Sequence, residues 1–236
     1  MVVEVVLFED VDLKDKYLIT GFQGVGFVGY ISVKAMIEET GARKIGMIDS
    51  TYVPPFVSLD EDGNVMMPFE FFLDEKNNFV YLLVRFQPDR DEIREFAHEL
   101  ANFTETHKMK GLVLLGGLND KMRDPEDETE YRCVVTNDFP LENPPLLEPR
   151  VIISGGIALI LIELKKRSIP TLTLFPYVTK EDSDMVAASN AIKIINTIFG
   201  TDIKTEKLLE EAKDFESDAD QILMHQKKKS SNDFYT

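Results

Sequence analysis

The chain has 236 residues, enough for one large domain or two small ones, and its 44% hydrophobic and 29% charged residues are ordinary for a globular protein. Its net charge of −16, from 26 Lys and Arg against 42 Asp and Glu, disfavours sequence-independent binding to nucleic acid or to anionic membranes. The single cysteine, Cys133, cannot form an internal disulfide, which favours a reducing compartment. The N-terminus lacks the basic segment of a signal peptide, and no apolar run is long enough for a membrane span. We therefore expect a soluble, cytoplasmic protein that binds neither nucleic acid nor membrane.

Alternating strand and helix patterns, separated by glycine-rich turns, predict an α/β domain with a layered, mostly parallel sheet flanked by helices. Residues 93–103 have the hydrophobic spacing of a helix that covers one sheet face, and the apolar run 112–115 indicates a strand buried on both faces. Turn signals at Asp62-Gly63 and Asn77-Asn78 indicate an antiparallel hairpin insertion. In chain order we expect a strand at 17–19, a helix ending at Gly41, a strand at 44–49, an antiparallel meander at 52–86, a helix from 88 to about 103, strands at 112–115 and 132–136, a helix at 157–166, a strand at 171–175 and a helix at 184–199.

The C-terminal segment has a different pattern. Its apolar residues recur at intervals of four and three, as in the seam of a coiled coil: Leu208, Ala212, Phe215, Ala219 and Ile222. This seam is shorter than three heptads, so packing on the chain's own domain and self-association are both open. Residues 226–233 are a polar stretch with no apolar face, which predicts a flexible segment before the terminal Phe234-Tyr235-Thr236. We divide the chain into an α/β domain at 1–203, a C-terminal helix at 204–225 and a tail at 226–236.

The run Gly24-x-Gly26-x-x-Gly29 matches the dinucleotide-binding fingerprint, and Asp49 follows twenty residues later at the end of a strand. However, the turn already begins at Gly21, and Phe22, Val25 and Phe27 place bulky apolar groups where phosphates would lie. The alternative is that these glycines allow close packing of strand and helix without a ligand. We favour this second interpretation and expect a structural turn made by Gly21, Gly24, Gly26 and Gly29.

The sequence offers little for catalysis. His98, His107 and His225 have no partner at metal-ligand spacing, and Cys133 lacks a nucleophile signature and is typical of a small buried side chain. Ser154 precedes two glycines without the Gly-x-Ser-x-Gly elbow, and no Walker-type phosphate loop occurs. We expect no catalytic residues, no metal and no cofactor.

The run from Gly21 to Gly29 resembles the signature turn of the proteasome assembly chaperone type 2 family, especially of its archaeal members. Gly116-Gly117, Gly155-Gly156 and Ala187-Ala188 are consistent with this resemblance, which covers about residues 1–215. It implies an α/β layered domain related to nucleoside-phosphorylase-like architectures, without a cofactor. Gln23 stands where the family often has proline, a departure that concerns only the geometry of the turn.

The last three residues, Phe234-Tyr235-Thr236, resemble the hydrophobic–Tyr–any motif that proteasome activators insert into pockets between α-subunits of the core particle. The resemblance implies that the terminal carboxylate binds a pocket lysine, the Tyr hydroxyl forms a hydrogen bond and an aromatic ring fills an apolar slot. A single tail would bind weakly, so the resemblance also implies a homo-oligomer, between trimer and pentamer with a tetramer favoured, whose tails act together.

The function implied is that of an ATP-independent proteasome activator or assembly chaperone, with the α-ring of the core particle as its partner. Two alternatives stay open. One is a dinucleotide- or nucleoside-binding enzyme that uses the turn from Gly24 to Gly29 together with Asp49. The other is a scaffold that binds another partner and carries the terminal motif by chance.

Overall fold

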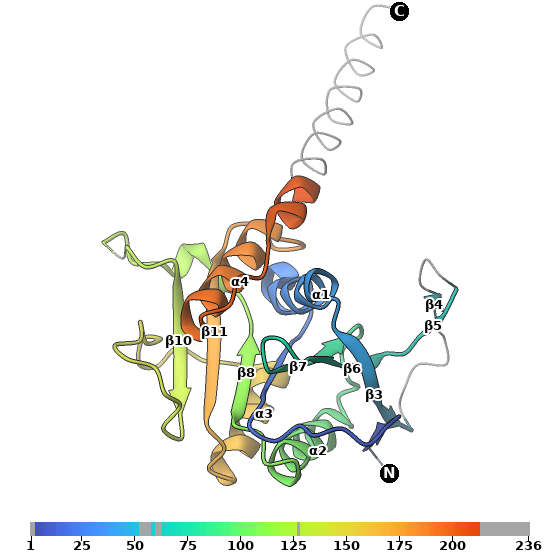
Figure 1. The fold of residues 1–236 in the computed structure, drawn as a ribbon. Helices are drawn as coiled ribbons and strands as arrows, with labels where there is room; N and C mark the ends of the chain where they lie inside the picture. Colours follow the sequence, from blue (N-terminus) through green and yellow to red (C-terminus); the bar gives the residue numbers. More distant parts are fainter. Residues whose placement is uncertain (1–2, 52–57, 60–62, 127, 213–236) are drawn as a thin grey trace, which may run out of the picture.

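A computed structural model describes residues 3–51, 58–59, 63–126 and 128–212. In this part of the chain, a nine-stranded open sheet lies between helices on both of its faces, which confirms the expected α/β class (Figure 1). The helices are α1 (Val28–Thr40), α2 (Ile93–Thr106), α3 (Gly155–Lys166) and α4 (Met185–Phe199), with short 3-10 helices at Val25–Phe27 and Asp120–Met122. The strands are β1 (Val3–Leu7), β2 (Tyr17–Gly21), β3 (Arg43–Ser50), β4 (Ser58–Leu59), β5 (Val65–Met66), β6 (Phe69–Asp74), β7 (Phe79–Val84), β8 (Gly111–Leu115), β9 (Leu118–Asn119), β10 (Tyr131–Thr136) and β11 (Thr171–Val178).

The sheet has a parallel centre and antiparallel ends. Its order is β1-β3-β6-β7-β2-β8-β11-β10, and β9 pairs with the far end of β11. Strands β7, β2, β8 and β11 are parallel, with Ile19 of β2 opposite both Tyr81 and Val113, whereas the outer pairs are antiparallel. The predicted hairpin around Asn77-Asn78 is confirmed as β6–β7, and its second strand belongs to the parallel centre rather than to an added edge.

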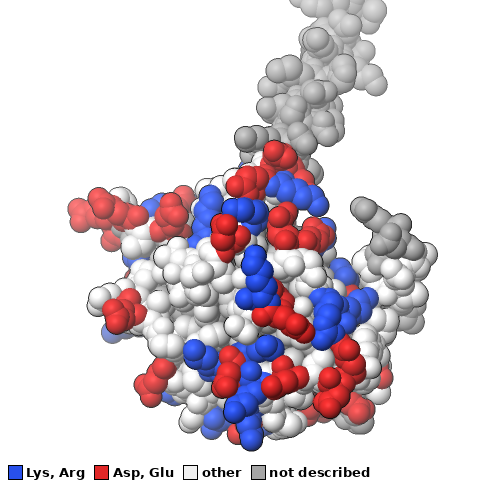
Figure 2. Space-filling view, viewed as in Figure 1, with Lys and Arg blue, Asp and Glu red and all other residues white. Residues whose placement is uncertain are grey.

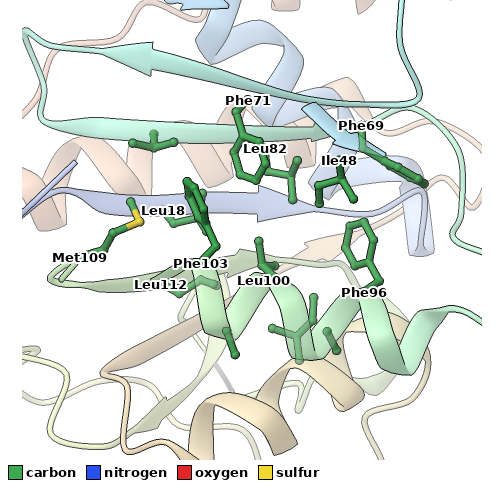
Figure 3. Close-up of a cluster of buried hydrophobic side chains, with 14 of the residues drawn as sticks. Leu18, Ile48, Phe69, Phe71, Leu82, Phe96, Leu100, Phe103, Met109 and Leu112 are labelled. Carbon is green, nitrogen blue, oxygen red and sulfur yellow. The ribbon is translucent and has the colours of Figure 1, made fainter. Parts of the chain in front are cut away.

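The two faces of the sheet carry separate hydrophobic cores. Side chains alternate along a strand, so Leu18 of β2 belongs to one core and Ile19 to the other. Helices α2 and α3 cover the first face, and α1 and α4 cover the second. Figure 3 shows Phe96, Leu100 and Phe103 on one side of α2, directed at the sheet. This helical spacing was predicted from the sequence, and the structure confirms it.

Glycines end two of the helices where the sequence predicted stops. Gly41 follows α1 with φ 62° and Gly200 follows α4 with φ 68°, left-handed conformations that glycine adopts without steric cost. Helix α3 begins at Gly155, two residues before the predicted start, because both glycines before Ile157 are already in its first turn. Strands β1 and β9 were not predicted.

The beginning of the predicted C-terminal helix packs on the domain. Residues 206–212 are helical, and Leu208 and Ala212 are buried. Phe215, Ala219 and Ile222 of the seam lie outside the described residues. No helix in the described part of the chain combines the length and the apolar character needed to cross a membrane.

Candidate functional site

The glycine turn brings three elements into direct backbone contact. A Cβ added to Gly21 would lie 2.5 Å from the Cα atom of Gly29 and 2.7 Å from the carbonyl oxygen of Leu115. A Cβ on Gly29 would lie 2.8 Å from the Cα atom of Gly21. The end of β2 and the start of α1 therefore approach each other and β8 more closely than any side chain would allow. Gly21 and Gly29 thus lie where the backbones of the three elements are closest.

Gly26 is closed in by the loop that joins β11 to α4. Its φ is 61°, and a Cβ there would lie 2.5 Å from the Cγ1 atom of Val178. The N–H of Gly26 donates to the carbonyl oxygen of Glu181 at 3.0 Å, and its own carbonyl accepts from the N–H of Asp184 at 2.9 Å. The loop thus occupies the space beside this glycine and binds its backbone. Gly24 differs, because a Cβ there would meet nothing within 4 Å.

Asp184 holds this loop and the start of α4 together. One carboxylate oxygen accepts from the N–H of Ala187 at 2.9 Å, and the other accepts from the N–H of Thr179 at 2.8 Å and of Lys180 at 3.2 Å. Burial raises the pKa of Asp184, but these hydrogen bonds outweigh burial, so the pKa lies below its usual value. Asp184 therefore acts as a charged N-cap that fixes the loop over the glycine turn.

Asp49 does not lie where the dinucleotide fingerprint requires its acid. In that fold the acidic residue ends the strand next to the one that enters the glycine loop. Here Asp49 is on β3, and both β6 and β7 stand between β3 and β2. At about 4.8 Å per strand, the two strands are roughly 14 Å apart. The geometry does not combine Asp49 with the turn from Gly24 to Gly29 into a nucleotide cradle.

The largest cavity lies at the carboxyl ends of the central strands, where β2 and β8 are neighbours. The chain after β2 enters α1 on one face of the sheet, whereas the chain after β8 passes through β9 and β10 before it enters α3 on the other face. In open α/β sheets, ligands bind in the crevice at such a switch point. A groove of about 940 Å³ lies here, between the glycine turn, the residues after β8, the segment 147–153 and the start of α3. We call this the switch-point groove.

The wall of the switch-point groove is mainly apolar. Val25, Met122 and Ile152 line it and are all exposed, Ile152 at 88% of its full surface. Arg150 is the single charged side chain among the described lining residues. In contrast, Lys or Arg and Asp or Glu side chains are interspersed over the face shown in Figure 2. An apolar group can therefore be buried in the groove with little desolvation of charged side chains.

Gln23 ties the rim of the groove to the chain after β7. Its side-chain amide donates to the main-chain carbonyl oxygen of Arg85 at 2.7 Å. The main-chain carbonyl oxygen of Gln23 accepts from the side-chain amide of Gln87 at 2.9 Å. Gln23 therefore has a hydrogen-bonding role in the turn.

Sequence reasoning did not identify the groove. Gly116-Gly117 and Gly155-Gly156 were noted only as features of a resemblance, yet both pairs line the groove together with Gly24. Pairs of glycines that each follow an apolar run were the signal available for this site.

Within the described residues, the remaining candidates do not form a catalytic set. His98 is exposed, 3.6 Å from Glu163, and His107 Nδ1 lies 3.0 Å from the carbonyl oxygen of Phe103. Cys133 is fully buried in β10, and burial raises the pKa of its thiol to about 11. Among the described residues there is no cluster of His, Cys, Asp or Glu suited to a metal ion. His225 and the terminal residues Phe234, Tyr235 and Thr236 lie outside them.

These features define an α/β protein with a parallel-centred sheet, whose strand ends carry a packing turn and an apolar groove. The chain belongs to the PAC2 family, which it matches over residues 18–223. This confirms the family expected from the glycine run. That the chain is an archaeal member stays a prediction.

Several solved structures have the same fold. PbaA of Pyrococcus furiosus, described as an archaeal homolog of proteasome-assembly chaperone, is 22% identical with a TM-score of 0.81, covering 95% of this chain and 93% of that one. PbaB of Pyrococcus furiosus, described as an archaeal proteasome activator, is 21% identical with a TM-score of 0.75, covering 93% and 98%. A Mycobacterium tuberculosis proteasome-assembly chaperone homologue is 14% identical with a TM-score of 0.60, covering 87% and 94%. No curated protein sequence matches the chain. At these identities the likeness establishes the fold.

Proposed function

We propose that this protein is an ATP-independent proteasome activator or assembly chaperone of the cytoplasm, without catalytic residues or cofactor of its own. It would act as an oligomeric scaffold whose C-terminal tails dock into the α-ring pockets of the proteasome core particle. Two features support the proposal together: membership of the PAC2 family and the terminal Phe234-Tyr235-Thr236. The printed descriptions of PbaA and PbaB connect this fold with proteasome assembly and activation.

The terminal residues have the chemistry that such docking needs. A chain end supplies a carboxylate for a charge-assisted hydrogen bond, Tyr235 supplies a hydroxyl group, and Phe234 supplies an apolar ring. Lys227, Lys228 and Lys229 precede them and would keep the tail hydrated and attract it to an acidic rim. The three lysines are equally consistent with a simple solubilising linker.

Several tails on one particle would make weak contacts effective. Once one tail is bound, the others are held near their pockets at a high effective concentration. We propose a homo-oligomer of three to five chains, with four favoured, as the source of this multivalency. Its mass is measurable by sedimentation of the full chain.

Binding to the core particle tests the proposal. The full chain and a variant that ends at Asp233 are passed over immobilised core particle without nucleotide. Saturable binding of the full chain, with about a hundredfold loss for the shortened one, is the expected result because multivalent contacts are lost together. Equal binding of both would contradict docking through the tail, and binding by neither would contradict the proteasome as partner.

The nucleotide-binding alternative gains no support from the geometry. Asp49 is separated from the turn by two strands, and the β11–α4 loop closes Gly26. A titration with nicotinamide and adenine nucleotides, followed by thermal unfolding, provides a direct check. We expect no shift of the unfolding midpoint at millimolar ligand, and a clear shift would revive this alternative.

A further inference from the structure

We propose that the switch-point groove binds the terminal residues Phe234-Tyr235-Thr236 of the same chain. This proposal rests on the proposed function, because it names where the docking tail is held when no core particle is present. The volume of the groove, about 940 Å³, lies in the range of about 300–1,000 Å³ typical of ligand sites.

The wall of the groove matches an aromatic peptide end. Val25, Met122 and Ile152 expose apolar surface around it, and burying an aromatic ring against such surface removes that surface from water. The backbones of Gly116-Gly117 and Gly155-Gly156 also line it, so a flat ring can approach the main chain closely.

Arg150 gives the groove one positive charge. Arg150 is the single charged lining side chain among the described residues, and it makes no ion pair with any of them. In a chain of net charge −16, most of the surface repels an anion, whereas this position attracts one. A guanidinium binds a terminal carboxylate in a bidentate manner. The first-turn N–H groups of α3, which begins at Gly155 beside the groove, have no partner within the helix and add to this attraction.

The segment that follows the last described residue is long enough to reach the groove. Leu208 and Glu211 share a surface pocket with Tyr30 and Lys34 of α1, and α1 begins three residues after the groove residue Val25. If residues 213–225 are helical, as the sequence predicts, they extend about 20 Å. The eleven residues 226–236 span up to about 36–40 Å when extended, which is long enough for the terminus to return to the surface of its own domain.

Cross-linking of the full chain tests the occupant. One variant carries Met122→Cys at the groove and Asp233→Cys next to the intact terminal triplet, and both thiols are joined with a short bifunctional reagent. The control carries Ile162→Cys with Asp233→Cys, since Ile162 is on α3 outside the groove lining and is 47% exposed against 54% for Met122. Cys133 is fully buried and does not compete.

We expect the Met122 pair to cross-link about tenfold faster than the control pair, because docking raises the local concentration of the tail. Adding Arg150→Glu should slow the Met122 pair by about tenfold, as a charged contact is replaced by repulsion. Equal rates for the two pairs would overturn the proposal. Dominant links between two Met122→Cys positions would also overturn it and would assign the groove to a second copy. The assay contains no proteasome, so loss of core-particle binding alone would leave this inference standing.

Discussion

At the scale of single residues, the four glycines of the turn have different reasons to be glycine. Gly29→Ala would force the start of α1 away from the ends of β2 and β8. We expect this overpacking to lower the free energy of unfolding by about 1–3 kcal/mol. Gly24→Ala meets no neighbour and should change it by less than about 0.5 kcal/mol. Denaturant titration of both variants gives the comparison. An equal cost for Gly24→Ala would mean that the turn binds or packs against something at that position.

The stabilisation that Asp184 provides should depend on pH. Asp184→Ala removes the N-cap of α4 and the anchor of the loop over Gly26, and we expect a loss of about 1–2 kcal/mol at pH 7. The pKa of Asp184 is lower in the folded protein than in the unfolded chain. Its contribution is therefore fully present above the ordinary pKa of about 3.9 and is lost as the pH falls through the lower folded-state pKa. Unfolding curves between pH 7 and pH 3 should show the two proteins converging only below pH 4, and a constant difference would contradict the role of the charge.

Cys133 should be chemically silent in the folded protein. It is fully buried in β10, and burial raises the pKa of its thiol to about 11, so little thiolate forms near neutral pH. We expect alkylation by iodoacetamide at pH 8 to be about a hundredfold slower than in the chain unfolded by guanidinium, because reaction waits for opening. Mass spectrometry over time measures the rate, and rapid modification of the folded chain would contradict the buried environment.

At the scale of elements, the packing of segment 206–212 should contribute to the free energy of unfolding of the domain. Leu208 is buried with the core between α1 and α4, and Leu208→Ala should cost about 2–3 kcal/mol if the segment unfolds with the domain. Glu210→Ala, at an exposed position of the same segment, is the matched control and should be nearly neutral. Hydrogen exchange of residues 206–212 distinguishes the cases. Rapid exchange in the unmodified protein would mean that this segment is only loosely attached.

Elements with a local signal were predictable from the sequence, whereas their order in the sheet was not. The amphipathic spacing of α2, the apolar run of β8 and the hairpin turn at Asn77-Asn78 are local signals, and the structure confirms all three. The position of β7 beside β2 is not local, because strand order depends on contacts between segments distant in the chain. Strand β1 has a weak pattern and is fixed by its partner β3.

For the site, the packing role of Gly21 and Gly29 was predictable, because a glycine run between a strand and a helix has few other uses. The separation of Asp49 from the turn was not predictable, since a spacing of twenty residues does not reveal that two other strands lie between. The groove was missed for a similar reason. Its wall is assembled from five segments that are separate in the sequence, and only the fold brings Val25, Met122 and Ile152 together.

At the scale of the whole molecule, the protein combines a rigid α/β body with a terminal triplet of distinct chemistry. The net charge of −16 favours repulsion between copies, which opposes the proposed oligomer at low ionic strength. This predicts that the mass of the particle is sensitive to salt: raising the ionic strength screens the repulsion and should stabilise the oligomer. Sedimentation at about 0.05 M and 0.5 M salt, where the Debye length differs about threefold, would show this, and dissociation at high salt would instead indicate contacts held by ion pairs.

The central claim, that the terminal residues act on the proteasome, is tested most directly by peptide hydrolysis. Purified core particle is assayed with a fluorogenic peptide, without nucleotide, in the presence of the full chain or of the chain ending at Asp233. We expect the full chain to accelerate hydrolysis and the shortened chain, with an unchanged unfolding midpoint, to have no effect. Equal acceleration by both proteins would contradict the account, because the body of the protein would then act without Phe234, Tyr235 and Thr236.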